Sequence, residues 1–215
     1  RSKELTEQFI FQSTGGTPWD LEKYSFQNKI SYEILDKYYG ILLLEAQNKV
    51  VDSAFRYLEK KRDPKERFYM PRRKQFLKIG LTEALQGMID DKYDILCVSL
   101  IPGAGKTTVE KMFNALVAGW FPKDFSLFYS HSGDITRMYY DGVYDIVTNS
   151  DEYTWNEIFP GLSVTSTNAK MEQFNIGKYK SFPSVQCTSV GSKNAGKVRA
   201  SKFLLVDDMI GGIEE

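Results

Sequence analysis

Cysteine and histidine are scarce in this chain of 215 residues. The two cysteines, Cys97 and Cys187, are too few for a disulfide framework, and with the single histidine, His131, they do not make a four-ligand zinc site. No apolar run reaches the roughly 18 residues that a membrane-spanning helix needs. The first residues, RSKELTEQ, do not form a signal-peptide pattern. Disulfide-rich secreted proteins, zinc enzymes and membrane proteins are therefore largely excluded, and we expect no membrane partner.

The chain also has no net charge, because 28 Lys and Arg residues balance 28 Asp and Glu residues. Bulk charge therefore does not indicate a polyanion-binding protein, but basic residues are concentrated in two windows. Residues 56–78 contain ten basic and three acidic residues, a net charge of +7, and residues 170–202 contain seven and one, a net charge of +6. Each window either forms a solvated face or contacts the phosphates of duplex DNA.

Apolar residues make up 42% of the chain, which is enough to bury a sizeable core. In the first part of the chain they recur at steps of three and four, which predicts helices over 31–62 and 72–89. We therefore predict a helical N-terminal region over residues 1–65. The chain has no initiator Met and ends at IGGIEE, so we expect it to be a piece of a longer protein.

Residues 66–215 alternate between predicted strands and predicted helices. The expected strands are 95–100, 125–130, 184–190 and 203–206, and the expected helices run from 106 to about 118 and from 135 to 147. This alternation predicts an α/β domain with a mostly parallel central sheet flanked by helices. Cys97 and Cys187 fall in strand patterns, so we expect both to be buried in the core.

The clearest motif is SLIPGAGKTT at Ser99–Thr108, a predicted buried strand followed by a glycine-rich turn and a helix. Glycines let successive backbone N–H groups point inward around phosphate oxygens, and the helix N-terminus adds its dipole. Lys106 is expected to reach the β- and γ-phosphates, and the Thr107 hydroxyl to bind Mg²⁺. The residues expected to bind the nucleotide here are Pro102, Gly103, Ala104, Gly105, Lys106, Thr107 and Thr108.

The motif is incomplete, because Leu100 stands where the full phosphate-loop pattern has glycine. A glycine–lysine turn that begins an ordinary helix is the alternative. A second half of the site is expected after the apolar strand 203–206, where Asp207 and Asp208 follow. Asp207 is expected to hold Mg²⁺, and Asp208 to position the attacking water as a general base. Alone, such an acid pair could also be a turn or a helix cap.

From about Tyr69 to Glu215 the chain resembles the ATPase domain of a tailed-bacteriophage terminase large subunit, the DNA-packaging motor. The resemblance rests on the GKT loop after a short strand, on Ser130-His131-Ser132 at the end of the next strand, and on SDEYTWNEIFPGL at Ser150–Leu162. Its most specific part is VGSKNAGKVRASKFLLVDDMI, which runs directly into the acid pair.

The resemblance implies a P-loop NTPase of the additional-strand ATPase type, whose Mg-dependent ATP hydrolysis powers translocation of double-stranded DNA into a procapsid. It implies a ring of identical subunits, with the portal protein and the terminase small subunit as partners, in the cytoplasm of an infected bacterium at the procapsid portal. Two departures stand out. Gly103 occupies a position where many relatives carry Arg, and the chain ends seven residues after Asp208, so the coupling strand and the nuclease domain of that family are not in it.

Further residues are candidates for roles that the family has. Gln75 is expected to contact the adenine edge, and Arg72 or Arg73 to stack on the base or touch phosphate, although a basic helix start would look the same. Arg199 is the first candidate for a cation supplied to a neighbouring subunit, with Lys197 second and Arg137 weaker. Ser130, His131 or Ser132 either senses the γ-phosphate or shapes a turn.

Other functions fit the same core. A DNA helicase or remodelling ATPase would need further motifs after Asp208, and a non-catalytic nucleotide-binding assembly module would not need a complete set of site residues. A small-molecule kinase is a further alternative. The presence of Lys106, Thr107, Asp207 and Asp208 disfavours the non-catalytic module, and the resemblance favours the hydrolysing motor.

Overall fold

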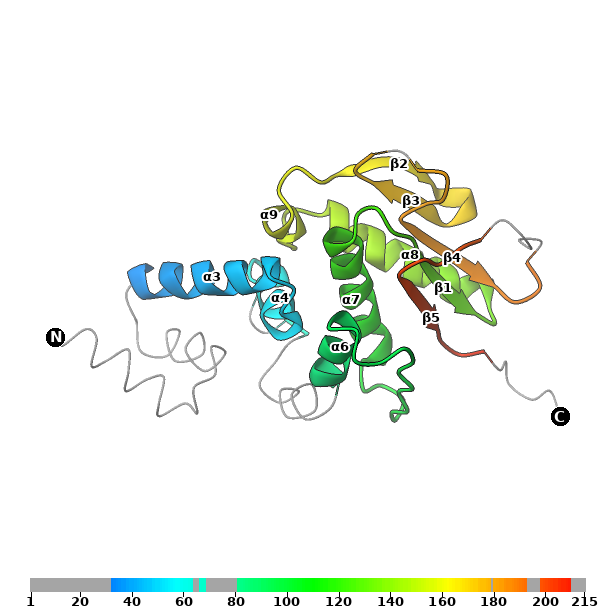
Figure 1. The fold of residues 1–215 in the computed structure, drawn as a ribbon, viewed down its shortest axis with the longest axis horizontal. Helices are drawn as coiled ribbons and strands as arrows, with labels where there is room; N and C mark the ends of the chain where they lie inside the picture. Colours follow the sequence, from blue (N-terminus) through cyan, green and yellow to red (C-terminus); the bar gives the residue numbers. More distant parts are fainter. Residues whose placement is uncertain (1–31, 64–65, 69–80, 179, 193–197, 210–215) are drawn as a thin grey trace.

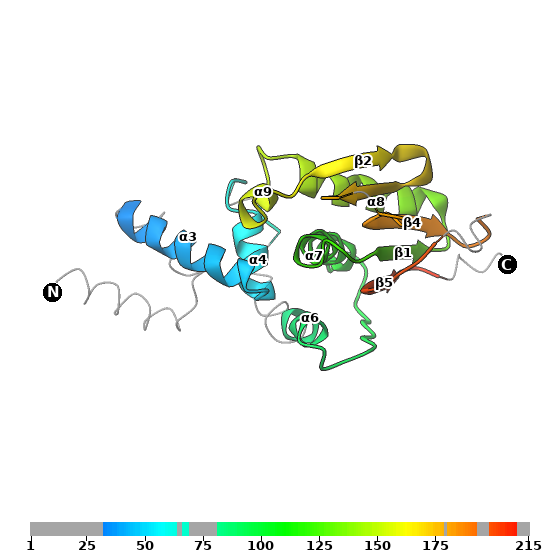
Figure 2. The same ribbon diagram turned by 45° about the horizontal axis from the view of Figure 1, so that its top comes forward.

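The fold was established from a computed structural model that describes residues 32–63, 66–68, 81–178, 180–192 and 198–209. Its described helices are α3 (Tyr32–Gln47), α4 (Val51–Leu58), α6 (Thr82–Ile89), α7 (Lys106–Trp120), α8 (Gly133–Thr148), α9 (Trp155–Ile158) and the 3₁₀ turn η2 (Ala169–Met171). Its strands are β1 (Ser126–Ser130), β2 (Val164–Asn168), β3 (Gln173–Ile176), β4 (Val185–Ser189) and β5 (Phe203–Val206). Helix α3 and the sheet lie at opposite ends of the molecule, with α7 between them (Figures 1 and 2).

The predicted α/β class is confirmed, but the expectation of a mostly parallel sheet was wrong. The five strands follow the order β2-β3-β4-β1-β5, and the sheet is mixed. Strand β1 is parallel to both β4 and β5, whereas β3 is antiparallel to β2 and to β4. Strands β2 and β3 form a short antiparallel unit around η2, and Glu172 makes the return with a φ of 49°. Polar residues dominate β2, which is why apolar patterning did not predict it.

The predicted buried strand at 95–100 is not a strand. Its side chains alternate, with Leu96, Val98 and Leu100 half-buried against the core, while Ile95 is 81% exposed. Only one face of the segment is therefore covered, and no described strand pairs with it. Residues 94–98 instead line a cavity of about 830 Å³ together with residues 200–206. The expectation that Cys97 is buried was wrong for this reason, whereas Cys187 is buried as predicted.

The predicted helices of the N-terminal region are present as α3 and α4. They are separate helices because the chain turns at Asn48–Val50, where Lys49 has a φ of 64°. Of the predicted helix at 72–89, α6 covers the last part, and residues 69–80 lie outside the described residues. Among the described residues, no helix combines the length and the apolar character needed to cross a bilayer.

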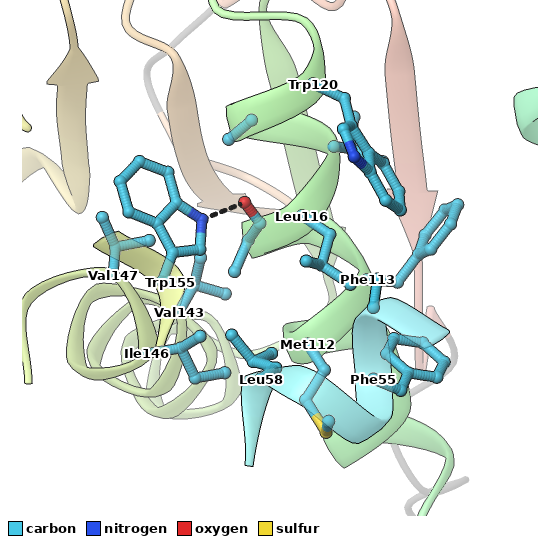
Figure 3. Close-up of a cluster of buried hydrophobic side chains, with 14 of the residues drawn as sticks. Phe55, Leu58, Met112, Phe113, Leu116, Trp120, Val143, Ile146, Val147 and Trp155 are labelled. Atoms are coloured by element: carbon cyan, nitrogen blue, oxygen red, sulfur yellow. Dashed lines mark hydrogen bonds between the residues drawn. The ribbon is translucent and has the colours of Figure 1, made fainter. Parts of the chain in front are cut away.

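Helix α7 is the centre of the hydrophobic core. Its residues from Met112 to Trp120 are buried, and α4, α8 and α9 contribute side chains around it (Figure 3). Two indole N–H groups connect α7 to its neighbours, both at 2.8 Å: Trp155 of α9 donates to the Ala115 carbonyl of α7, and Trp120 of α7 donates to the Ala46 carbonyl of α3. The packing fixes the axis of α7, and therefore the place where its N-terminus meets the end of β5.

Candidate functional site

Two glycines shape the loop that leads into α7. Gly103 has a φ of 76° and Gly105 a φ of 88°, so both occupy the left-handed region that favours glycine. The Ala104 N–H donates to the Ile101 carbonyl at 3.2 Å, and α7 begins at Lys106 with no side-chain cap. The first N–H groups of a helix have no partner within the helix, so this terminus offers donors to an anion.

Gly105 also leaves room for a neighbouring side chain. A Cβ atom at this position would lie 2.3 Å from the ring of Phe68, which is buried against the loop. A Cβ at Gly103 would meet nothing within 4 Å. The two glycines therefore differ: both supply backbone conformation, but only Gly105 makes room for a neighbouring side chain.

The two halves of the predicted site meet at Asp207. Lys106 Nζ donates to Asp207 Oδ1, and Thr107 Oγ1 donates to Asp207 Oδ2 at 3.2 Å. The Asp207 side chain is 3% exposed and that of Lys106 30% exposed, so the ion pair is largely shielded from water. The hydrogen bond to Asp207 raises the pKa of Lys106 above its ordinary value and outweighs the opposing effect of burial.

The strand ladder places Asp207 and Asp208 at the carboxyl end of β5. The Asp207 N–H donates to the Tyr129 carbonyl at 3.0 Å, and the His131 N–H donates to the Asp208 carbonyl at 3.1 Å. Asp208 has a φ of 45°, an uncommon conformation that Asp tolerates better than most residues. Its side chain is exposed, in contrast to that of Asp207.

Glu110 is a residue of this site that the sequence reasoning missed. It lies one helical turn after Lys106, lines the same cavity, and its buried Oε2 has no hydrogen-bond partner. Burial raises its pKa to about 7, with further contributions from the charges of Asp207 and Asp208, although Lys106 acts in the opposite direction. The i, i+4 spacing from Lys106 on a predicted helix was the signal that could have found it.

The Ser130-His131-Ser132 segment shapes the turn into α8. Ser132 caps the helix, because its hydroxyl accepts a hydrogen bond from the Asp134 N–H at 3.2 Å. Ser130 and His131 both contact the carbonyl of Asp208. The turn-shaping role expected as one of two alternatives is therefore present, and it involves the acid pair directly.

The remaining predicted residues are spread more widely. Pro102, Gly103 and Thr108 are exposed at the loop, while Gln75, Arg72, Arg73 and Lys197 lie outside the described residues. Arg199 is exposed, with its guanidinium 5.7 Å from the ring centre of Phe182, and it precedes β5, whereas Asp207 follows that strand. Arg137 donates to the Ala169 carbonyl at 2.6 Å and pairs with Asp141.

The two basic windows differ in structure. In the first, Arg56 and Arg67 are buried, and Lys60, Lys61 and Arg62 pair with acidic residues. In the second, Lys170, Lys178 and Arg199 are exposed. The described part of the first window therefore serves the fold, and the second retains cations at the surface.

The oxygen atoms at the expected Mg²⁺ site can be compared with those that the ion requires. Among the described residues, no group of three or more His, Cys, Asp or Glu side chains is arranged to hold a metal. Mg²⁺ in nucleotide sites is commonly bound by one or two protein oxygens together with phosphates and water. Thr107 Oγ1 and Asp207 Oδ2, 3.2 Å apart, are oxygens of that kind, so the residues fit the ion.

Comparison of the chain with protein-family models, with curated proteins and with solved structures finds no match.

Proposed function

We propose that this chain is a Mg-dependent ATPase whose phosphate loop is Gly103–Thr108. One observation carries the proposal: Lys106 and Thr107 at the start of α7 converge on Asp207 at the end of β5, about a hundred residues later. A lysine and a hydroxyl at a helix N-terminus, facing a buried acid at a strand end, form the arrangement that phosphate-loop nucleotide hydrolases use.

The chemistry follows from these groups. Backbone N–H groups at the N-terminus of α7 would bind phosphate oxygens, and Lys106 would transfer from Asp207 to the terminal phosphates. Thr107 and Asp207 would hold Mg²⁺, which neutralises phosphate charge when it is bound. Asp208, exposed beside this acid, would orient the attacking water and accept its proton.

For the cellular role, we propose the motor of a viral terminase large subunit, which moves double-stranded DNA. Support comes from the resemblance of residues 69–215 and from the exposed cations Lys170, Lys178 and Arg199 in the second basic window. Contacts between cations and phosphates suit a motor that must ignore base sequence. The portal and small-subunit partners and the subunit ring belong to this proposal through the resemblance alone.

The test is ATP turnover by the chain with and without duplex DNA. Lys106→Ala and Asp208→Asn are compared with Lys123→Ala and Asp151→Asn, which remove exposed charges elsewhere. We expect the first pair to abolish turnover and the second pair to leave it unchanged. DNA should stimulate the wild-type rate, and the double variant Lys170→Ala/Lys178→Ala should respond less to DNA.

Other outcomes separate the alternatives. MgATP binding that Lys106→Ala removes, without turnover, would indicate an unassembled motor that lacks the cation of its neighbouring subunit. Turnover without DNA stimulation would remove the main support for the motor role. A chain that binds no nucleotide would contradict the proposal as a whole.

A further inference from the structure

Three hydrogen-bond donors at the end of β1 converge on a single atom, the backbone carbonyl oxygen of Asp208. The backbone N–H of His131 lies 3.1 Å from it, the Ser130 hydroxyl lies 3.4 Å from it, and the His131 ring contacts it through Nδ1. Nδ1 must carry the proton to donate to a carbonyl. This convergence occurs where Asp208 takes its left-handed φ of 45°.

The Asp208 side chain is held in a different way from that of Asp207. The Asp207 carboxylate is buried and bonded to both Lys106 and Thr107. The Asp208 carboxylate is exposed and makes no hydrogen bond or ion pair with the described residues. Among the described contacts, only those to its backbone hold Asp208 in place, and its carboxylate oxygens stay open to solvent. A residue that directs water needs both properties.

We propose that His131 is a positioning residue for hydrolysis: its ring holds the Asp208 backbone so that the carboxylate faces the attacking water. The inference rests on the proposed ATPase function and adds a residue to it. His131 acts through Asp208 and does not itself touch nucleotide. It also connects the acid pair to α8, because Ser132, the next residue, caps that helix.

The contact has a spectroscopic signature that does not depend on activity. His131 is the only histidine of the chain, so ¹⁵N-histidine labelling gives a single pair of ring nitrogen signals. A neutral imidazole carries its proton on one ring nitrogen, and the other nitrogen is an acceptor. We expect the Nδ1–H tautomer, whereas an unconstrained ring would exchange between tautomers.

Kinetics test the role. We expect His131→Ala to lower kcat for ATP by about 10- to 100-fold, the scale that misplacing a catalytic group costs, with KM changed less than about twofold. His131→Asn can still donate to the Asp208 carbonyl and should restore part of kcat. Ser132→Ala is the matched control, because it removes the α8 cap without touching Asp208. If the segment only shapes the turn, Ser132→Ala and His131→Ala should lower kcat equally.

The outcomes distinguish this inference from the proposed function. If the wild-type chain hydrolyses ATP through Lys106 but His131→Ala keeps its kcat, the inference is wrong and the ATPase proposal stands. Freely exchanging tautomers of His131 would overturn the inference in the same way. If Lys106→Ala changes neither nucleotide binding nor turnover, the ATPase proposal fails, and the positioning role fails with it even where the Nδ1–H signal shows the contact.

Discussion

Lys106 and Asp207, 101 positions apart in the chain, form an ion pair in which the carboxylate is 3% exposed. Thr107 donates to the other oxygen of the same carboxylate. In the proposed ATPase a phosphate would compete with Asp207 for Lys106. The ion pair holds the lysine at the start of α7, and its contribution to stability can be measured without nucleotide.

Removing Lys106 should destabilise the fold because Asp207 keeps a buried charge without its cation. We expect Lys106→Ala to lower the free energy of unfolding by about 1–3 kcal/mol, and Lys106→Ala/Asp207→Asn to recover part of that loss. Urea denaturation of both variants and of Lys123→Ala, the exposed control, measures this. Equal stability of the single and double variants would mean that the unpaired Asp207 charge is not the source of the loss.

The two loop glycines allow conformation and space to be separated. Gly103→Ala places a side chain at a φ of 76° in open space, so it should cost about 1–2 kcal/mol of stability. Gly105→Ala adds a collision with Phe68 at 2.3 Å and should cost at least about 1 kcal/mol more. Thermal denaturation compares them. Phe68→Leu in the Gly105→Ala background should recover the additional loss, and its failure to do so would point to backbone strain alone.

Much of the site was predictable from sequence because its signals are local. Gly103, Gly105 and Lys106 form a turn and a helix start within a few residues, and β5 was predicted with its observed bounds, 203–206. The apolar residues 203–206 followed by Asp207 are by themselves a pattern that predicts a buried strand ending in an acid. Once α7 packs against the sheet that contains β5, Lys106 at the start of the helix lies close to Asp207 at the end of the strand.

The errors have a common physical origin in tertiary context. The apolar run 95–100 has the composition of a buried strand, but a strand also needs a hydrogen-bonding neighbour, which no local pattern specifies. Strand β2, at the edge of the sheet, is polar and mostly exposed, so no apolar periodicity predicted it. Glu110 lines a cavity together with residues of α6, of β5 and of the segment 94–98, and the neighbours of Glu110 in the sequence do not reveal these partners.

Glu157 of α9 should make stability depend on acid pH. Burial opposes its ionisation, but hydrogen bonds from Lys60, Tyr57 and Lys61 outweigh this and lower its pKa from 4.5 to about 2. Its ionised form therefore stabilises the fold above the unfolded value of 4.5, and that contribution is lost as the pH falls toward 2. Because the side chain is 36% exposed, screening limits the effect to about 1 kcal/mol or less.

The comparison is between wild type and Glu157→Gln in urea at a series of pH values. The variant should be less stable at neutral pH, and the difference should shrink as the pH falls below 4.5. Asp151→Asn, at an exposed position, is the control. A difference that stays constant with pH would assign the loss to packing and not to charge.

Glu110 should act in the opposite direction. Burial, followed by the charges of Asp207 and Asp208, raises its pKa from 4.5 to about 7 despite the opposing charge of Lys106. Between these two values the folded chain binds more protons at this site than the unfolded chain, so its contribution to stability falls as pH rises and reaches its lowest level above pH 7.

Glu110→Gln keeps the shape of this side chain and removes its ionisation, so the variant should not suffer that loss. We expect it to exceed wild type in unfolding free energy by about 1–3 kcal/mol at about pH 8, and by far less at about pH 5. Urea denaturation at both pH values measures the difference, with Asp151→Asn as the exposed control. A variant that is equally stabilised at both pH values would show that Glu110 ionises normally.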